Sequence, residues 1–214
     1  MSIFERNKGF EMNGLSMPKI LSAAGHLVLI PAVTYWFAYR GGAASAAAYL
    51  GAGVQELSPA KTNLFFAIDI FYCARWALGS LTTLGAWQWW NPIPVVGIHA
   101  AIHCMLKYLL CTVVVAPTSI WSYAFPIGSP ASASLTSLDY AAAAICILGG
   151  LLQNGSELQR YFFKRDPRNS GKVHTGGLFS VARFINHTGH VLHDLGNFMF
   201  GGCAIFLVVR NPKP

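Results

Sequence analysis

Basic residues and histidines concentrate in one stretch of the chain, residues 160–196. Three histidines lie near its end, and the stretch carries six cations: Arg160, Lys164, Arg165, Arg168, Lys172 and Arg183. Arginine binds phosphate through two parallel N–H bonds and lysine binds it as a point charge. The adjacent glycines at 176 and 177 would let the backbone approach a ligand closely. Two explanations of these residue types remain open: the positive-inside bias together with anionic lipid headgroups, and a phosphate-bearing ligand.

A second polar pattern consists of His99, His103 and Lys107, which follow one another at four-residue spacing and so share a helix face. Two histidines at that spacing could bind one metal ion, and the three histidines after residue 186 are also regularly spaced. A lysine one turn further along would repel the cation. Hydrogen bonding between helices is therefore the preferred interpretation, and we expect no metal site.

The elements that position these residues are apolar helices. Hydrophobic residues make up 54% of the 214 and charged residues only 11%, where a soluble domain carries about a quarter charged residues. A helix needs roughly 20 apolar residues to cross the hydrocarbon core. The sequence therefore predicts an all-α, polytopic transmembrane helix bundle of five to six spans, near residues 19–39, 63–87, 93–116, 138–162 and 187–209, with 41–57 as the uncertain sixth.

We expect a polar N-terminal tail over residues 1–18 and a single transmembrane domain over residues 19–214, with a basic loop at 160–186. The Ala/Gly-rich segment 41–57 is short for a span; a short tilted helix, a re-entrant piece and an interfacial segment all remain open. Ionisable groups within spans need a partner, a cavity or a function. Asp69 and Arg75 are six residues apart and do not share a helix face.

Charge asymmetry predicts a topology. With five spans, the N-terminal tail and the basic loop lie on the same side, and positive residues favour the cytoplasmic or matrix side. The protein is thus expected in the endoplasmic reticulum or the mitochondrial inner membrane, with the basic loop facing the cytoplasm or matrix. Nucleic acid is not an expected partner, because the cations flank helices and form no separate domain. The expected partner is the lipid bilayer.

The basic loop also carries a family pattern. The run ELQRYFFKRDPRNSGKVHTGGLF and the residues after it resemble the signature region of steroid 5α-reductase-like (DUF1295) membrane proteins. The matching positions are Gln159, Asp166, Pro167, Asn169, Gly171, Lys172, Gly177, Leu178, Arg183, Asn186, Gly189 and Gly196. Upstream, the run QELSP at 55–59 is similar to the Q-E-L-P run of steroid 5α-reductases, and YCAR at 72–75 resembles their Y-x-x-R.

The resemblance implies an NADPH-dependent reductase of a carbon–carbon double bond conjugated to a carbonyl. Its substrate would be a lipid or steroid-like molecule that enters from the bilayer. Glu56 and Tyr72 would be the proton-donating catalytic pair. The cofactor would be bound by Arg165, Asn169, Lys172, Gly177, Arg183, Asn186 and His190.

The signature departs from the family at Ile185, His187 and His190, where Pro, Tyr and Glu are usual. An imidazole thus replaces a carboxylate, and the resemblance leads us to expect a chain that is C-terminally short relative to the family. One hypothesis is a divergent NADPH-dependent reductase. The other is a reductase fold that has lost catalysis and serves as a structural or accessory subunit with partners in a larger membrane complex. A methyltransferase of the isoprenylcysteine type, whose signature is related, is a third.

Overall fold

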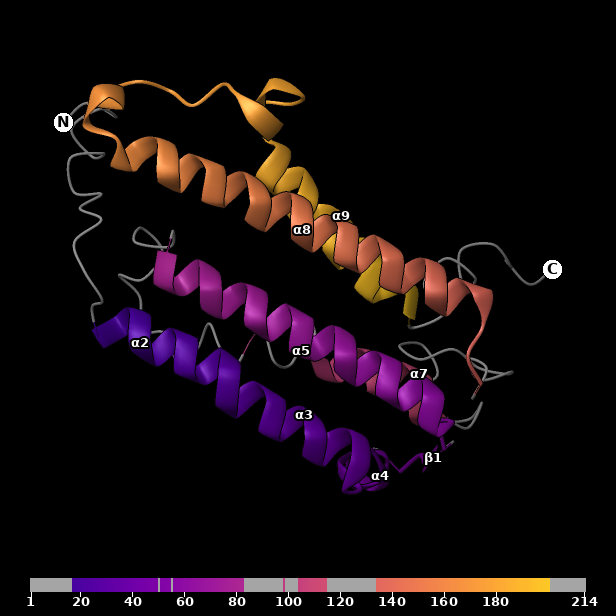
Figure 1. Ribbon diagram of the computed structural model, residues 1–214. Coiled ribbons are helices and arrows are strands. Elements are labelled where there is room, and N and C mark those ends of the chain that lie inside the picture. The colour runs from indigo at the N-terminus through magenta and orange to yellow at the C-terminus, as the bar shows by residue number, and fades with distance from the viewer. Residues whose placement is uncertain are drawn as a thin grey trace.

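The computed structural model describes residues 17–49, 51–54, 56–82, 98, 104–114 and 134–200, most of which lie in helices. The long helices run side by side (Figure 1). Helix α5 (Pro59–Thr82) lies in the middle, the first helix lies on one side of it, and the hairpin of α8 (Ser137–Arg165) and α9 (Ile185–Phe200) lies on the other. Because α5 contacts both neighbours, polar groups on it can meet groups from either side.

The first helix comprises α2 (Met17–Ala24), a π-helical turn η2 (Gly25–Leu29) and α3 (Ile30–Tyr39), which follow one another without a break. Pro31 lies in the first turn of α3. In a regular α-helix its ring would clash with the carbonyl four residues earlier. The wider π turn lies just before the proline and contains the residue whose carbonyl would clash, and so it relieves the clash.

The segment 41–57 does not form a long helix. It contains α4 (Gly42–Tyr49), which spans about 12 Å, and the short strand β1 (Gly53–Val54). Strand β1 pairs antiparallel with β2 (Val113–Val114), which directly follows α7 (Leu106–Thr112). This ribbon therefore links the end of α4 to the end of α7.

Two helices within the described part of the chain are long and apolar enough to cross a membrane: Lys19–Tyr39 and Pro59–Thr82. They correspond to the first two expected spans. Helix α8 has 29 residues but carries several polar side chains in its second half. The expected spans 93–116 and 187–209 lie partly outside the described residues. The total of five or six spans is therefore not confirmed.

Helix α8 begins at a reciprocal cap. Thr136 Oγ1 accepts a hydrogen bond from the Asp139 N–H at 3.3 Å, and Asp139 Oδ2 accepts one from the Thr136 N–H at 2.8 Å. This capping box satisfies two backbone donors that a helix N-terminus would otherwise leave without partners. The turns η5 (Pro167–Asn169) and η6 (Gly177–Ser180) connect the end of α8 to α9.

Glycines bring α8 and α9 into backbone contact. A Cβ added to Gly189 would lie 2.5 Å from the nitrogen of Gln153 and 2.6 Å from the carbonyl oxygen of Gly149. One added to Gly196 would lie 2.6 Å from Cys146 Sγ. Close approach at small residues is how helices pack where the solvent is itself apolar. The two signature glycines thus hold the hairpin together.

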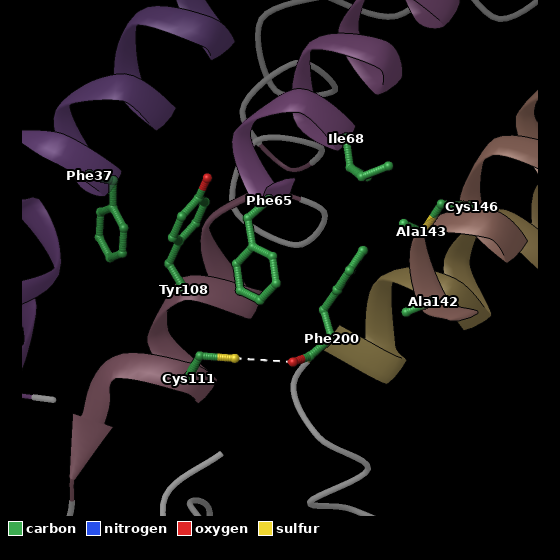
Figure 2. Close-up of a cluster of buried hydrophobic side chains, with 9 residues drawn as sticks. All are labelled: Phe37, Phe65, Ile68, Tyr108, Cys111, Ala142, Ala143, Cys146 and Phe200. Atoms are coloured by element: carbon green, nitrogen blue, oxygen red, sulfur yellow. Dashed lines mark hydrogen bonds between the residues drawn. The ribbon is translucent and has the colours of Figure 1, made fainter. Parts of the chain in front are cut away.

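Aromatic rings fill the core between α5, α7 and α9 (Figure 2). Tyr108 lies between Phe37 and Phe65, and Phe65 meets Phe200 edge-on with ring centres 4.9 Å apart. Cys111 Sγ donates to the carbonyl of Phe200 at 3.1 Å. These contacts fix the position of α7 relative to the hairpin.

Two buried ion pairs connect α5 to its neighbours. Lys107 Nζ on α7 pairs with Asp69 Oδ1, and Lys61 Nζ lies 3.3 Å from Asp139 Oδ1 at the start of α8. All four side chains are at most 4% exposed. Lys107, expected to bond between helices, therefore does so, and its partner is Asp69. His99 and His103 lie outside the described residues.

Candidate functional site

A second polar cluster lies between the first helix, α5 and the α8–α9 hairpin, and Arg75 is at its centre. The Arg75 guanidinium lies 5.2 Å from the ring centre of Tyr72 and 5.6 Å from that of Trp76. Its Nη1 donates to Gln153 Oε1 on α8. The side chain is only 4% exposed, so its charge is held among aromatic faces and amide groups.

Two nitrogens of Arg75 remain available. Neither Nε nor Nη2 has a hydrogen-bond partner among the described residues. A buried guanidinium carries five N–H donors in a fixed planar fork, and leaving donors unmet in a buried site is costly. Asp194 on α9 interacts electrostatically with this cation. The fork is thus only partly used within the helices.

The histidines of α9 have different environments. His193 is fully buried, its ring stacks on Tyr72 at 5.3 Å, and its Nδ1 donates to the carbonyl of Cys146 at 2.9 Å. His190 Nε2 lies 3.5 Å from Asp194 Oδ2, one turn further along. His187 is exposed. Of the three, His190 alone has both a carboxylate partner and a buried nitrogen, Nδ1, without a partner among the described residues.

His26 closes the cluster from the first helix. It lies in the π turn and is 1% exposed. Its Nδ1 lies 2.8 Å from the carbonyl of Ser22 and its ring stacks on Trp76 at 5.8 Å. The sequence analysis did not identify this residue. The available signal was Pro31, which follows the apolar run that contains His26. The π turn lies just before this proline, and π turns occur often at functional sites.

Polar side chains of α8 extend the cluster toward the basic loop. Asn154 Nδ2 donates to the Arg75 carbonyl at 3.2 Å. One turn later, Glu157 accepts a hydrogen bond from Asn186 Nδ2 at 2.6 Å and pairs with Arg160. These polar contacts follow α8 from the Arg75 cluster to the end of the helix.

Several signature residues hold the basic loop against α8. The N–H of Leu178 donates to Gln159 Oε1 at 2.9 Å. Gly177 has a φ of +58°, and a Cβ there would lie 2.9 Å from Gln159 Cδ, so a side chain would push the loop away. Asn169 Nδ2 donates to the carbonyl of Phe163 at 3.1 Å and so caps α8.

The predicted cofactor residues therefore divide into two groups. Asn169, Gly177 and Asn186 engage α8 directly. The side chains at the second group of positions point outward: Arg165 lies over the Tyr161 ring at 5.4 Å, Arg183 over the Phe184 ring at 5.5 Å, and Lys172 is exposed. His190 belongs to neither group, because it faces Asp194 and Trp76 within the helices.

One acidic residue accompanies these loop cations. Asp166 accepts two hydrogen bonds from Arg168 Nε and one at 2.6 Å from its Nη2. These side-chain bonds, and a further bond from the Arg168 N–H, hold the pKa of Asp166 below its ordinary value. Arg168 is thereby engaged, whereas Arg165, Lys172 and Arg183 have no carboxylate partner among the described residues.

The predicted catalytic pair is not adjacent. Glu56 is exposed and precedes α5, and Tyr72 is fully buried thirteen residues beyond Pro59, which begins that helix. At 1.5 Å per residue this separation is about 20 Å along the helix. The groups that do surround Tyr72 are Arg75, Trp76 and His193.

No group of three His, Cys, Asp or Glu side chains that could hold a metal ion occurs in the described ranges. His193 bonds to a backbone carbonyl and His190 to a carboxylate. Their regular spacing reflects the helix pitch.

Comparison with known proteins identifies a family over much of this region. The family described as "Protein of unknown function (DUF1295)" matches residues 83–207, which include α7, the α8–α9 hairpin and the basic loop. The "Probable O-methyltransferase ustE" of Ustilaginoidea virens is 40% identical over 50 residues. That match covers 23% of this chain and 18% of the relative. No solved structure matches.

Proposed function

The chain belongs to the DUF1295 family, and from this membership we propose that it is a membrane-embedded, NADPH-dependent reductase of a conjugated carbon–carbon double bond in a lipophilic substrate. The observation that carries the proposal is the arrangement of the site. Exposed cations that have no carboxylate partner in the described part of the chain lie on a loop that bonds to α8 through Gln159 and Glu157. One turn earlier on α8, Asn154 bonds to the carbonyl of Arg75 in the buried polar cluster on α5.

The loop fits a cofactor with several phosphates. Arg165, Lys172 and Arg183 are exposed and would bind the phosphate oxygens by charge-assisted hydrogen bonds. The internal contacts of Asn169 and Gly177 hold the loop in one shape, so its cations need less ordering when the cofactor binds. NADPH, when bound, would supply a hydride.

The buried cluster fits the other half of the reaction. The Tyr72 phenol would donate a proton, and the Arg75 cation 5.2 Å from its ring would stabilise the phenolate that remains. His193, stacked on Tyr72, orients the phenol. The surrounding rings exclude water, which strengthens each of these electrostatic interactions. Glu56, exposed before α5, is not needed in this arrangement.

The family region and the helix directions also suggest a topology. We propose five spans with the basic loop on the cytoplasmic or matrix side, in the endoplasmic reticulum or the mitochondrial inner membrane. The start of α2 and the end of α8 lie at one end of the helices, and the end of α3 and the start of α8 lie at the other (Figure 1), as alternating passages require.

NADPH titration of the purified protein in detergent tests the proposal, with thermal stabilisation as the signal. We expect saturable stabilisation that Arg183→Ala weakens at least about tenfold, as loss of one charge-assisted bond to phosphate predicts. Arg40→Ala is the matched control, because Arg40 is exposed and directly follows α3, which ends away from the basic loop. No saturable effect at millimolar NADPH would contradict the proposal and favour an accessory role in a membrane complex.

A second candidate, O-methyl transfer, is favoured by the relative from Ustilaginoidea virens. It would use the same buried cluster to hold a hydroxyl or carboxyl acceptor. S-adenosylmethionine carries no phosphate, so the loop cations would have less influence on its binding. Saturable stabilisation by S-adenosylmethionine, unchanged in Arg183→Ala and without any response to NADPH, would select this alternative.

A further inference from the structure

The unmatched donors of the Arg75 fork and the His190–Asp194 pair lie around one side chain, Trp76. Arg75 lies 5.6 Å from the Trp76 ring centre and His190 lies 6.2 Å from it. The Arg75 cation interacts electrostatically with both His190 and Asp194. Three nitrogens of these two side chains, Arg75 Nε and Nη2 and His190 Nδ1, are buried and have no hydrogen-bond partner among the described residues.

We propose that these nitrogens form a binding site for the acidic oxygen of a lipophilic weak acid, namely a carboxylic acid on an apolar chain. Only the identification of this ligand as the substrate rests on the proposed function, because the binding of the acid itself needs no cofactor. The planar Arg75 fork suits the two oxygens of a carboxylate.

The charges balance only if the ligand arrives as the neutral acid. A proton on His190 Nε2 faces Asp194 at 3.5 Å, which leaves Nδ1 with a lone pair. The carboxylic acid loses its proton to Nδ1: its O–H bond breaks, an N–H bond forms, and the electron pair stays on the oxygen. Two cations, Arg75 and His190, then face two anions, Asp194 and the ligand. An isolated buried anion would be far more costly.

Access is from the bilayer side of α9. The side chains of His190 and Asp194 are 35% and 25% exposed, whereas Arg75 behind them is 4% exposed. Their neighbours Val191 and Leu195 are exposed apolar residues. An apolar chain can therefore remain against this face while its head reaches the fork.

The test uses the wild-type protein in nanodiscs without cofactor, titrated with the fluorescent fatty acid cis-parinaric acid and, separately, with its methyl ester. Empty nanodiscs supply the background. We expect saturable binding of the acid and binding of the ester at least about tenfold weaker, as loss of one bond to a charged group predicts. Equal binding of acid and ester would overturn the proposal without any need for a variant.

Variants locate the site. His190→Gln is expected to weaken binding of the acid about tenfold or more and to leave binding of the ester unchanged. His187→Gln is the matched control, since His187 is exposed one turn earlier on the same helix and contacts Phe184. Acid binding that is unaffected by His190→Gln would refute the assignment. If the protein binds the acid but shows no saturable binding of NADPH, the proposed function is refuted and the acid-binding site is not.

Discussion

Gly189→Ala is expected to destabilise the protein, because a Cβ at this position would meet the backbone of α8. The added carbon would lie 2.5 Å from the nitrogen of Gln153 and 2.6 Å from the oxygen of Gly149, where unstrained contacts are about 3.5 Å or longer. Helices α8 and α9 would have to separate by about 1 Å. A gap of that size forfeits up to about half of the dispersion energy of each contact along the interface.

The magnitude follows from two opposing terms. Overpacking costs about 1–3 kcal/mol, and the higher helix propensity of alanine returns up to about 1 kcal/mol. Both neighbours are backbone atoms and cannot rotate away, so the cost lies toward the upper end of its range. We therefore expect the free energy of unfolding to fall by about 1–2 kcal/mol.

Unfolding in mixed micelles with increasing SDS, followed by circular dichroism, measures this difference. Gly155→Ala is the matched control on α8, because its Cβ would meet only Leu178 Cδ1, at 3.4 Å. That variant should be as stable as the wild type or more so. If Gly189→Ala unfolds at the same SDS fraction as Gly155→Ala, the role assigned to the signature glycine is wrong.

Three further predictions concern contacts that fix the helices and the loop. Lys107→Met leaves Asp69 buried without its cation and should lower the free energy of unfolding by about 3–5 kcal/mol; the double variant with Asp69→Leu should recover part of that loss in the same SDS assay. Thr136→Ala removes the cap of α8 and should lower the free energy of unfolding by about 1 kcal/mol, whereas Thr136→Ser keeps the capping hydroxyl and should retain most of that stability. Gln159→Ala removes the acceptor for the Leu178 N–H and should speed limited proteolysis between residues 166 and 184, with helix content by circular dichroism unchanged; an unchanged cleavage rate would contradict this account of the loop.

The sequence was sufficient to locate the region that matters. The ordered matches from Gln159 to Gly196 predicted a steroid 5α-reductase-like (DUF1295) protein, and the match over residues 83–207 bears out the DUF1295 family but not the reductase-like subclass. Hydropathy also predicted the two long apolar helices. Both signals are local in the chain, since each depends on residue types at fixed spacing.

The partners of the polar residues could not be predicted in the same way. Asp69 pairs with Lys107, which is 38 positions away, and Arg75 bonds to Gln153, which is 78 positions away. Such pairs depend on which helices are neighbours, and spacing along one helix carries no such information. The glycine at 177 illustrates the same limit: its small size was expected to admit a ligand, and it admits the Gln159 side chain.

The central claim is that the chain transfers hydride from NADPH to a lipophilic substrate. The most direct test supplies NADPH carrying deuterium in place of the transferable hydride to the protein in nanodiscs loaded with a membrane lipid extract, and follows the lipids by mass spectrometry. We predict a lipid product that gains one deuterium from the cofactor and one proton from water, and that is absent with Tyr72→Phe. The absence of deuterium from every lipid, with NADPH bound and the wild-type protein folded, would contradict the account.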